Sequence, residues 1–306
     1  MKLREEQVFG IARKVVANMT GESFRTIAHS VVSYEADVTD LLPVIKELNE
    51  GVEKENRLSI NTVMLGIMCE AIKAAPIVNS HLEFNSRLVR GKLKVYDTIN
   101  ISMPTILPSG EMMTINMRNM EDKSLTEIGE AIKETFAKVK NTDFNEALYN
   151  VSLHDTLEGL KHGKVLQALR RLYGSKMPGE HRVKLLKGEA KKKYYAIPES
   201  ERLSQKELEQ GTITISNLGS IYREGTNRCY LLEIVPPQTC VIALLSIRKE
   251  ARVVTDENGE DKIEVRHILP MTFAFDHRAY DYCVLIPLLR RLDEIFADPS
   301  VVKEWK

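Results

Sequence analysis

The sequence has no excess of charge of either sign. Its 306 residues contain 43 lysines and arginines and 43 aspartates and glutamates, so the formal net charge is zero. Such a chain is not expected to bind nucleic acid or anionic membranes through its overall field. No apolar run approaches the roughly 20 residues that a membrane-spanning helix needs, and the N-terminal segment lacks the apolar core of a signal peptide. We therefore expect a soluble, cytoplasmic protein with no nucleic-acid or membrane partner.

Cysteine is scarce, and its positions show no pattern that would hold a metal. The four residues are scattered, and each lies in or beside an apolar run: Cys69, Cys229, Cys240 and Cys283. The clustered spacings of zinc sites are missing, so we predict no metal site. Reduced thiols in the core of a protein from a reducing compartment are the simpler interpretation.

Alternating helical and strand-like segments predict a mixed sheet flanked by helices, which belongs to the α/β class. Apolar residues at steps of three and four indicate helices, and short β-branched runs indicate strands. The main expected helices are 5–19, 41–48, 62–75, 124–139 and 284–296. The main expected strands are 26–38, 82–84, 88–89, 99–103, 112–117, 212–216, 230–234, 239–247, 251–254, 263–268 and 272–275. The turn Asp256-Glu257-Asn258-Gly259 predicts a hairpin between residues 251–254 and 263–268.

The candidate for chemistry with the clearest local pattern lies near the C-terminus. The strand-like run 272–275 is followed by Asp276-His277-Arg278-Ala279-Tyr280-Asp281, and a helix comes after it. A histidine held at the end of a strand suits a general base, and the acid four residues later could fix the loop. On spacing alone, a structural or solvated histidine is the commoner explanation. The same explanation is preferred for three others: His29, His81 and His267.

Five segments together resemble the catalytic domain of the dihydrolipoamide acyltransferases, the E2 components of 2-oxo acid dehydrogenase complexes. The segment above is similar to that family's D-H-R-x-x-D-G, with Tyr282 in place of the glycine. The other four are Gly211–Gly219 (like G-T-F-T-I-S-N-L-G), Ile234–Gln238 (like the N-P-P-Q turn), Glu35–Thr39 (like E-V-D-V-T) and Asp122–Leu125 (like D-R-K-S-I). The resemblance implies the chloramphenicol-acetyltransferase-like fold, an α+β two-layer sandwich, in a single catalytic domain over residues 1–306.

The resemblance assigns catalytic roles to three residues. His277 would be the base that removes the proton from an attacking thiol. Ser216 would donate a hydrogen bond to the oxyanion of the tetrahedral intermediate. Asp281 would hold the loop through an ion pair with an arginine, for which Arg13 and Arg25 are candidates. From the residues alone, the favoured explanation of Ser216 is a strand-end hydroxyl that bonds to its own backbone.

Three further residues beside these motifs are assigned to substrate binding: Asn217, Gly219 and Tyr282. Asn217 could position the substrate loop or simply cap a turn. Tyr282 replaces a motif glycine, so it would be strained if the backbone there needs a positive φ. Alternatively, its ring narrows the channel and changes which acceptor fits.

The resemblance also implies substrates and partners. Coenzyme A would carry the acyl group, and a dihydrolipoyl thiol would accept it. No lysine lies in a lipoyl-type hairpin, and no lipoyl or subunit-binding domain is recognisable, so the lipoyl group is expected from another, lipoyl-carrying chain. A homotrimer or larger homo-oligomer is expected, with the histidine and the serine of one site on different chains. The alternatives are a catalytically impaired oligomeric scaffold and an acyltransferase with an amine or hydroxyl acceptor.

The segment from about residue 141 to 210 is longer than the short linker of the resembled family. Between Lys161 and Tyr195 it is strongly basic, and it includes helical stretches such as Val165–Leu169. It could be a solvated helical excursion, a subunit contact, a dock for an acidic partner, or a lid that attracts the phosphates of coenzyme A. Nucleic-acid binding is not favoured, because aromatic residues do not alternate with the basic ones as a stacking platform would require.

Overall fold

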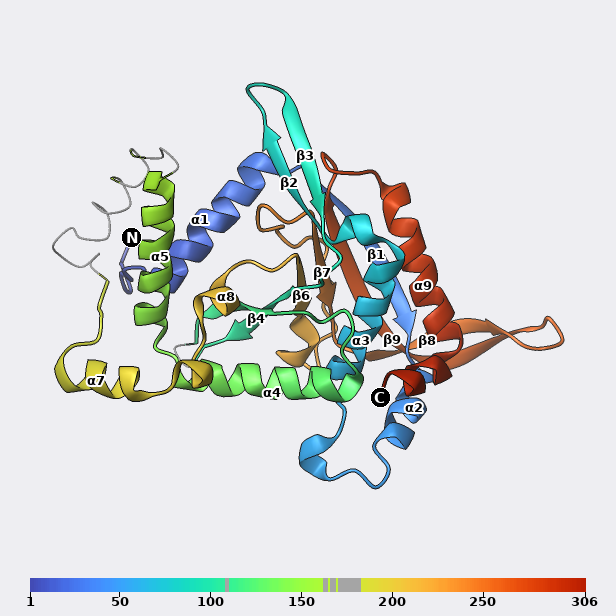
Figure 1. Ribbon diagram of the computed structural model, residues 1–306. Coiled ribbons are helices and arrows are strands. Elements are labelled where there is room, and N and C mark those ends of the chain that lie inside the picture. Colours follow the sequence, from blue (N-terminus) through green and yellow to red (C-terminus); the bar gives the residue numbers. More distant parts are fainter. Residues whose placement is uncertain (108–109, 162–164, 166–168, 170–182) are drawn as a thin grey trace. The chain divides into compact units, whose positions relative to one another are not determined.

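The computed structural model describes residues 1–107, 110–161, 165, 169 and 183–306 (Figure 1). The chain divides into two compact units, and each is described by itself. The first consists of Met1–Gly21, Thr105–Asn116 and Glu134–Gln210. The second consists of Glu22–Pro104, Met117–Lys133 and Gly211–Lys306. In the described part of the chain, no helix combines the length and the apolar content needed to cross a membrane.

A mixed sheet organises the second unit. Within this unit the order of the strands is β1-β9-β7-β6-β4, and β8 pairs with β9 outside this path. β6 runs parallel to β4 and β7, whereas β9 runs antiparallel to β1, β7 and β8. The bounds are β1 (His29–Asp37), β4 (Ile101–Ile106), β5 (Met112–Met117), β6 (Ile213–Asn217), β7 (Cys240–Leu244), β8 (Arg248–Thr255) and β9 (Asp261–Asp276). The predicted α/β class with a mixed sheet is confirmed.

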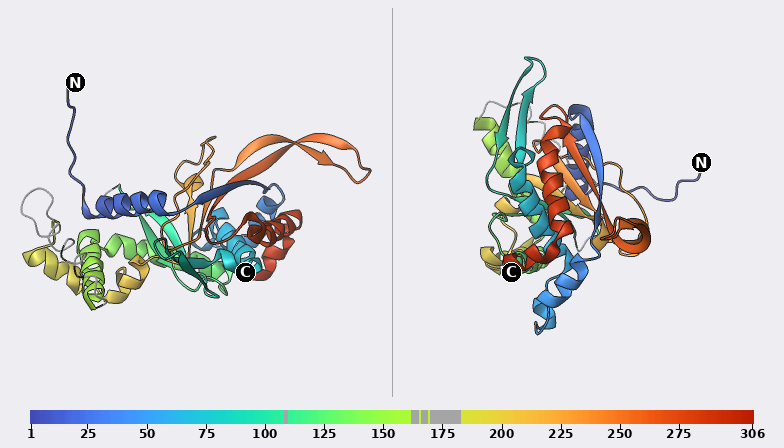
Figure 2. Two further views of the ribbon diagram at one scale, coloured as in Figure 1. Left: turned by 90° about the horizontal axis from the view of Figure 1, so that it is seen from above. Right: turned by 90° about the vertical axis from the view of Figure 1, so that its right-hand side faces the viewer.

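The main core lies between one face of this sheet and the helices that cover it. α3 (Ile60–Ala74) is apolar on nearly every side and is buried accordingly, and Ser59 caps it by accepting a hydrogen bond from the Thr62 amide at 3.1 Å. α9 (Ile286–Ala297) packs beside α3, as Figure 2 shows. α2 (Leu41–Leu48) and the first turns of α4 (Leu125–Asn141) complete the layer. The largest buried side chains of this core include Phe273, Met64, Ile67, Met68 and Leu125.

The opposite face of the sheet carries a smaller apolar cluster. Ile27, Ile234, Val241 and Ala274 are buried together there. Val241 lies on β7 and pairs with Ala274 on β9, so this cluster sits directly on the centre of the sheet. It joins the segment before β7 to the chain that leads into β1.

The second unit also contains a separate hairpin of two strands and several short 3-10 helices. β2 (Ser80–Asn85) pairs with β3 (Arg90–Val95). The predicted strand at residues 88–89 is wrong, because these residues form the turn of this hairpin and Val89 has φ of 50°. The 3-10 helices of this unit are η1 (Lys54–Asn56), η2 (Pro76–Val78), η4 (Leu218–Ser220), η5 (Tyr282–Leu285) and η6 (Pro299–Trp305).

The first unit has its own apolar cluster. The cluster joins residues from α1 (Ile11–Thr26), β5, α4 and α5 (Phe144–Lys161) with two loop residues, Leu107 and Leu203. Its other members are Ala12, Met113, Ile115, Val139 and Leu148. Buried Glu146 accepts hydrogen bonds from the Leu186 amide at 2.7 Å and from the Tyr195 hydroxyl at 3.2 Å. These bonds tie α7 (Gly188–Ala196) to α5. The unit also contains η3 (Glu199–Glu201) and α8 (Gln205–Leu208). Much of the predicted basic stretch lies outside the described residues, as does most of Val165–Leu169.

Two predicted elements are corrected. The first helix runs from Ile11 to Thr26 rather than over 5–19. An internal glycine costs a helix only about 1 kcal/mol, so Gly21 does not end it. Residues 230–234 form no strand; the amide of Ile234 bonds to a histidine side chain instead of a neighbouring strand. The predicted hairpin of residues 251–254 and 263–268 is confirmed as β8 and β9, and its Gly259 adopts φ of 81°.

Candidate active site

His277 lies immediately after the end of β9. Its amide donates a hydrogen bond to the Ala28 carbonyl at 2.9 Å, which continues the β1–β9 pairing by one residue. About half of its side chain is exposed, and Nδ1 lies 3.3 Å from an Asp281 carboxylate oxygen. The backbone is therefore fixed while the imidazole stays open, which is the arrangement a general base needs.

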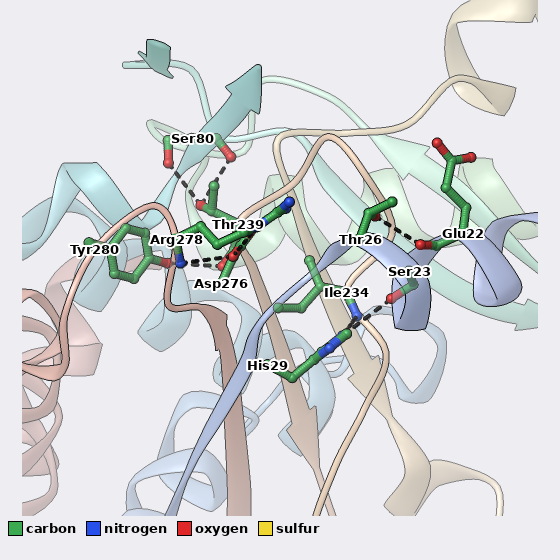
Figure 3. Close-up of polar contacts among 10 residues, drawn as sticks. All are labelled: Glu22, Ser23, Thr26, His29, Ser80, Ile234, Thr239, Asp276, Arg278 and Tyr280. Carbon is green, nitrogen blue, oxygen red and sulfur yellow. Dashed lines mark hydrogen bonds and ion pairs between the residues drawn. The ribbon is translucent and has the colours of Figure 1, made fainter. Parts of the chain in front are cut away.

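The residues on either side of His277 form a brace that the sequence analysis did not identify. The Asp276 carboxylate is buried and accepts hydrogen bonds from Arg278 Nε at 2.9 Å, from Arg278 Nη2 at 2.6 Å and from the Arg278 amide at 3.0 Å (Figure 3). A two-pronged pair between guanidinium and carboxylate fixes geometry as well as adding energy. The sequence signal for this brace is an aspartate and an arginine on either side of one histidine.

Tyr280 anchors the far side of the same loop. Its buried ring stacks on Phe275 with 5.7 Å between centroids, and its hydroxyl donates to the Thr239 carbonyl at 3.2 Å. The Asp276 amide donates to that carbonyl as well, at 2.9 Å. Burial raises the pKa of Tyr280 well above its ordinary value, so the hydroxyl remains a donor. Figure 3 shows the Thr239 side chain also meeting Ser80, with 2.8 Å between the hydroxyl oxygens.

Asp281 differs from the arrangement that the resemblance implies. Its side chain is largely exposed and its carboxylate faces His277. Among the described residues of the second unit, which include the candidate Arg25, no arginine forms an ion pair with Asp281. Arg13 belongs to the first unit, so its pairing with Asp281 stays a prediction. The arginine–aspartate pair that is present here joins Arg278 to Asp276.

Ser216 lies on β6 and is buried. Ile213 and Ile215 belong to the main core, so strand alternation directs Ser216 to the opposite face of the sheet. Phe273 and Phe275 on β9 also belong to the main core, and the same alternation continues to His277, whose ring lies 6.0 Å from that of Phe275.

The register places the two residues at opposite ends of the sheet. Ser216 pairs with Ala243, and Ala243 pairs with Thr272. His277 stands two strands away from Ser216 and five residues beyond Thr272. At about 4.8 Å per strand and about 3.4 Å per residue, this separation is roughly 20 Å. One chain therefore does not bring His277 and Ser216 together.

The assigned binding residues Asn217 and Gly219 shape the turn after β6. The Asn217 carboxamide oxygen accepts from the Ser220 amide at 2.8 Å, and its nitrogen donates to Asn61 at 2.6 Å. These contacts correspond to the capping alternative. A Cβ at Gly219 would meet the Leu245 carbonyl oxygen at 2.5 Å, so glycine is needed for the close approach of two backbones.

Tyr282 begins η5 and is half exposed, beside Asp281. Among the described residues other than glycine, only Val89 and Asn119 have a positive φ. The tyrosine therefore does not strain the backbone. Its ring is available to solvent at the end of the sheet that carries His277. In the described residues, no group of three or more histidines, cysteines and acids is arranged to hold a metal.

Comparison with known proteins decides the family. Residues 2–149 and 190–302 match the family described as 2-oxoacid dehydrogenases acyltransferase (catalytic domain). The chain belongs to this family. Residues 150–189, which the family match leaves out, fall inside the segment predicted to be an insertion.

Relatives with known names are similar over nearly the whole chain. The dihydrolipoyllysine-residue acetyltransferase component of the mitochondrial pyruvate dehydrogenase complex of Neurospora crassa is 23% identical over 287 residues, which cover 94% of this chain and 48% of that protein. Its counterpart from Dictyostelium discoideum is 25% identical over 287 residues, covering 94% of this chain and 34% of that protein. The chain thus spans about half or less of the length of these relatives.

Solved structures share the fold. A probable dihydrolipoamide acetyltransferase from Listeria monocytogenes has a TM-score of 0.64 at 18% identity, covering 97% of this chain and 95% of that one. The Azotobacter vinelandii dihydrolipoamide acetyltransferase has a TM-score of 0.63 at 17% identity, covering 97% and 93%. The family expected from the motifs is confirmed, and so is the fold of its catalytic cores.

Proposed function

We propose that this chain transfers an acyl group between coenzyme A and a thiol, and that the thiol is a dihydrolipoyl group carried by another chain. The observation that carries the proposal is His277, with its backbone fixed by Ala28 and its ring open beside Asp281. Membership in the acyltransferase family supports the reaction class.

The proposed step is a direct attack. With the His277 proton on Nδ1, facing Asp281, the Nε2 lone pair takes the proton of the attacking thiol. The sulfur forms a bond to the thioester carbonyl, and the resulting oxyanion accepts a hydrogen bond from Ser216. Collapse of the tetrahedral intermediate breaks the bond to the coenzyme A sulfur, which takes the proton back from His277.

We infer that each site is shared by two copies of the chain. A separation of roughly 20 Å is too long for a base and an oxyanion donor to act on one carbonyl, so Ser216 must come from a neighbour. A homotrimer or larger assembly supplies this pairing through a repeated head-to-tail interface. Two solved neighbours are relevant by their descriptions: the cubic core of a pyruvate dehydrogenase multienzyme complex, and the A. vinelandii enzyme, whose structure was determined to investigate the roles of a serine, a histidine and an asparagine four positions after that histidine.

The remaining expectations are kept as proposals. Asn217 and Gly219 would shape the acceptor side of the site through the turn after β6, and Tyr282 would line it beside His277. We retain one catalytic domain over residues 1–306 with an insertion at about 141–210. A reducing compartment such as the cytoplasm fits the four free cysteines, although the N. crassa relative is named as mitochondrial.

The test is turnover of acetyl-CoA with free dihydrolipoamide, in the native protein and in His277→Ala. We expect thioester formation by the native protein and its near-complete loss in the variant. Turnover with an amine or an alcohol in place of the thiol would change the acceptor class. If a folded oligomer turns over no acyl-CoA with any acceptor, the enzymatic proposal is wrong and the scaffold alternative holds.

A further inference from the structure

The residue just before β1 holds the backbone of His277. Ala28 accepts the His277 amide, and the next residue, His29, stands directly opposite Asp276 in the β1–β9 register. Directly opposed residues of an antiparallel pair project from the same face of the sheet. The His29 ring is therefore on the face that carries Asp276, and its position affects the strand end from which His277 extends.

The His29 ring joins three segments that are distant in the sequence. Its Nε2 accepts the Ile234 amide at 3.1 Å and lies 3.2 Å from the Ser23 hydroxyl (Figure 3). Both Ser23 and Ile234 are completely buried. The ring of Phe24 stacks on the imidazole with 5.3 Å between centroids. The end of α1, the start of β1 and the segment before β7 thus meet at one imidazole.

These contacts determine the protonation of His29. An amide can only donate, so the Nε2 that faces Ile234 must carry a lone pair, and the ring proton belongs on Nδ1. Burial lowers the pKa of His29 and outweighs the hydrogen bond that the ring donates to the Ile27 backbone, which acts the other way. The charged groups that face it are Asp276 and Glu233, which favour protonation, and Arg278, which opposes it. A protonated ring would present a donor to the Ile234 amide, and the contact would be lost.

We propose that His29 is a positioning residue for the reaction at His277. Its neutral ring holds the segment before β7 and the end of α1 against the first residue of β1, and so fixes the carbonyl that holds the His277 backbone. The inference rests on the proposed function, because it assigns His277 as the base. The cluster of Ile27, Ile234, Val241 and Ala274 extends the same contact onto β7 and β9.

Three substitutions at His29 distinguish the role of the hydrogen-bond acceptor from the role of the aromatic ring. His29→Gln reaches as far as Nε2 and can accept the Ile234 amide; His29→Asn is too short, and His29→Phe keeps the stacking on Phe24 but offers no acceptor. We expect kcat to fall by on the order of 10²-fold in the Asn and Phe variants, with the KM for acyl-CoA within about twofold. The Gln variant should restore most of kcat. Equal loss in all three variants, or no loss in the Phe variant, would overturn the assignment.

A control on the same strand separates stability from positioning. Tyr34 lies on β1 away from His277, and its hydroxyl donates to Asp293 at 2.7 Å. Tyr34→Phe removes a hydrogen bond from β1 and should lower the melting temperature without changing kcat. If Tyr34→Phe lowers kcat as much as His29→Phe does, the effect of His29 is general destabilisation and the proposal is wrong.

The pH profile gives an independent readout. Since the fold keeps His29 neutral, the unfolded chain binds more protons below about pH 6.5, and the free energy of unfolding falls as the pH falls through that range. In the native protein, protonation of His29 breaks the contact with the Ile234 amide and should add to the loss of kcat on the acid side. The acid limb of log kcat should therefore be less steep in His29→Gln than in the native protein. Identical acid limbs would contradict the proposal.

Hydrogen exchange distinguishes failure of this inference from failure of the proposed function. The His277 amide should exchange faster in His29→Phe than in the native protein, with His29→Gln close to native. This measurement needs no turnover. If the native protein is inactive but the amide responds, the proposed function is wrong and the positioning contact stands. If the amide does not respond in an active enzyme, the positioning role is wrong.

Discussion

The two ends of the central sheet each carry a residue assigned to the chemistry, but they are built in different ways. At the His277 end, side chains fix the loop: Arg278 holds Asp276, and Tyr280 stacks on Phe275. At the Ser216 end, the backbone sets the geometry, because the turn after β6 passes close to Leu245 and leaves room only for glycine. The His277 side chain is half exposed, whereas Ser216 is buried within a strand.

This difference indicates two half-sites on one chain. The His277 end presents a half-exposed imidazole, and the Ser216 end presents a buried hydroxyl next to a tight backbone turn. Neither end contains the other's group, and roughly 20 Å of sheet separates them. A rigid sheet cannot bend to close that distance, so we expect activity to depend on assembly.

The largest effects are expected from removing the reactive groups themselves. His277→Ala should lower kcat by about 10²–10⁴-fold, and Ser216→Ala by about 10²–10³-fold. Because the His277 side chain is half exposed and its amide bond to Ala28 remains, His277→Ala should stay folded. The measurements are steady-state turnover and thermal unfolding. A His277→Ala enzyme within tenfold of native kcat would refute the role of the base.

The next largest effects are expected at the two acids of the motif, Asp276 and Asp281, which should differ in their cost to stability. Asp276 is buried, and Asp276→Asn leaves Arg278 without its charged partner. The substitution should lower the free energy of unfolding by about 3 kcal/mol. This is near the lower end for a broken buried ion pair, because Arg278 is partly exposed. Asp281 is largely exposed, so Asp281→Asn should cost less than about 1 kcal/mol and reduce kcat only severalfold. Chemical denaturation and turnover measure both. The reverse ranking would place the structural role on Asp281, as the resemblance implied.

A smaller effect is expected at the Ser216 end from Gly219→Ala. The added methyl group would meet backbone atoms of Leu245 and Ser246, and such overpacking costs about 1–3 kcal/mol. Gly129→Ala is the matched control, because its Cβ would only touch Thr62 at 3.6 Å and alanine favours a helix by about 1 kcal/mol. Melting temperatures should move in opposite directions. Equal shifts would mean that the turn after β6 is not tightly packed.

The smallest effect on stability is expected at Tyr282. Its backbone is not in the left-handed region, so Tyr282→Phe should change the unfolding free energy by less than about 0.5 kcal/mol. Tyr282→Gly should change the KM for the thiol acceptor by a few fold if the ring lines the channel, with the KM for acyl-CoA unchanged. An unchanged KM for the thiol acceptor in Tyr282→Gly would show that Tyr282 does not line the binding site.

Much of the fold could be predicted from local patterns. The apolar helix now seen as α3, the helix α9 and the β8–β9 hairpin all follow periodicity and turn chemistry that act within a few residues. His277 was placed at a strand end for the same reason. The segment 230–234 was mistaken for a strand because its composition is strand-like, whereas its amide bonds to His29, more than 200 residues away in sequence.

The site could be predicted only in part, because its braces depend on tertiary contacts. The resemblance gives Asp281 a structural role, whereas the buried acid of this loop is Asp276, and burial is not visible in a motif. The sequence predicts only a structural or solvated role for His29, because Ser23 and Ile234 approach it only in the folded chain. The end of α1 was missed for a related reason: Ser23 and Ile27 are buried, and that packing lets the helix continue past Gly21.

The most direct test of two half-sites is a mixed oligomer of His277→Ala and Ser216→Ala chains. The two variants are co-expressed with different affinity tags, and oligomers that contain both are isolated. Each variant alone should be nearly inactive. Because a shared site can take His277 from one chain and Ser216 from its neighbour, the isolated mixed oligomers should recover about a third of native turnover if they are trimers, and about a quarter if they are much larger. Activity in mixed oligomers no higher than in either variant alone would mean that both groups act within one chain, and would contradict the account.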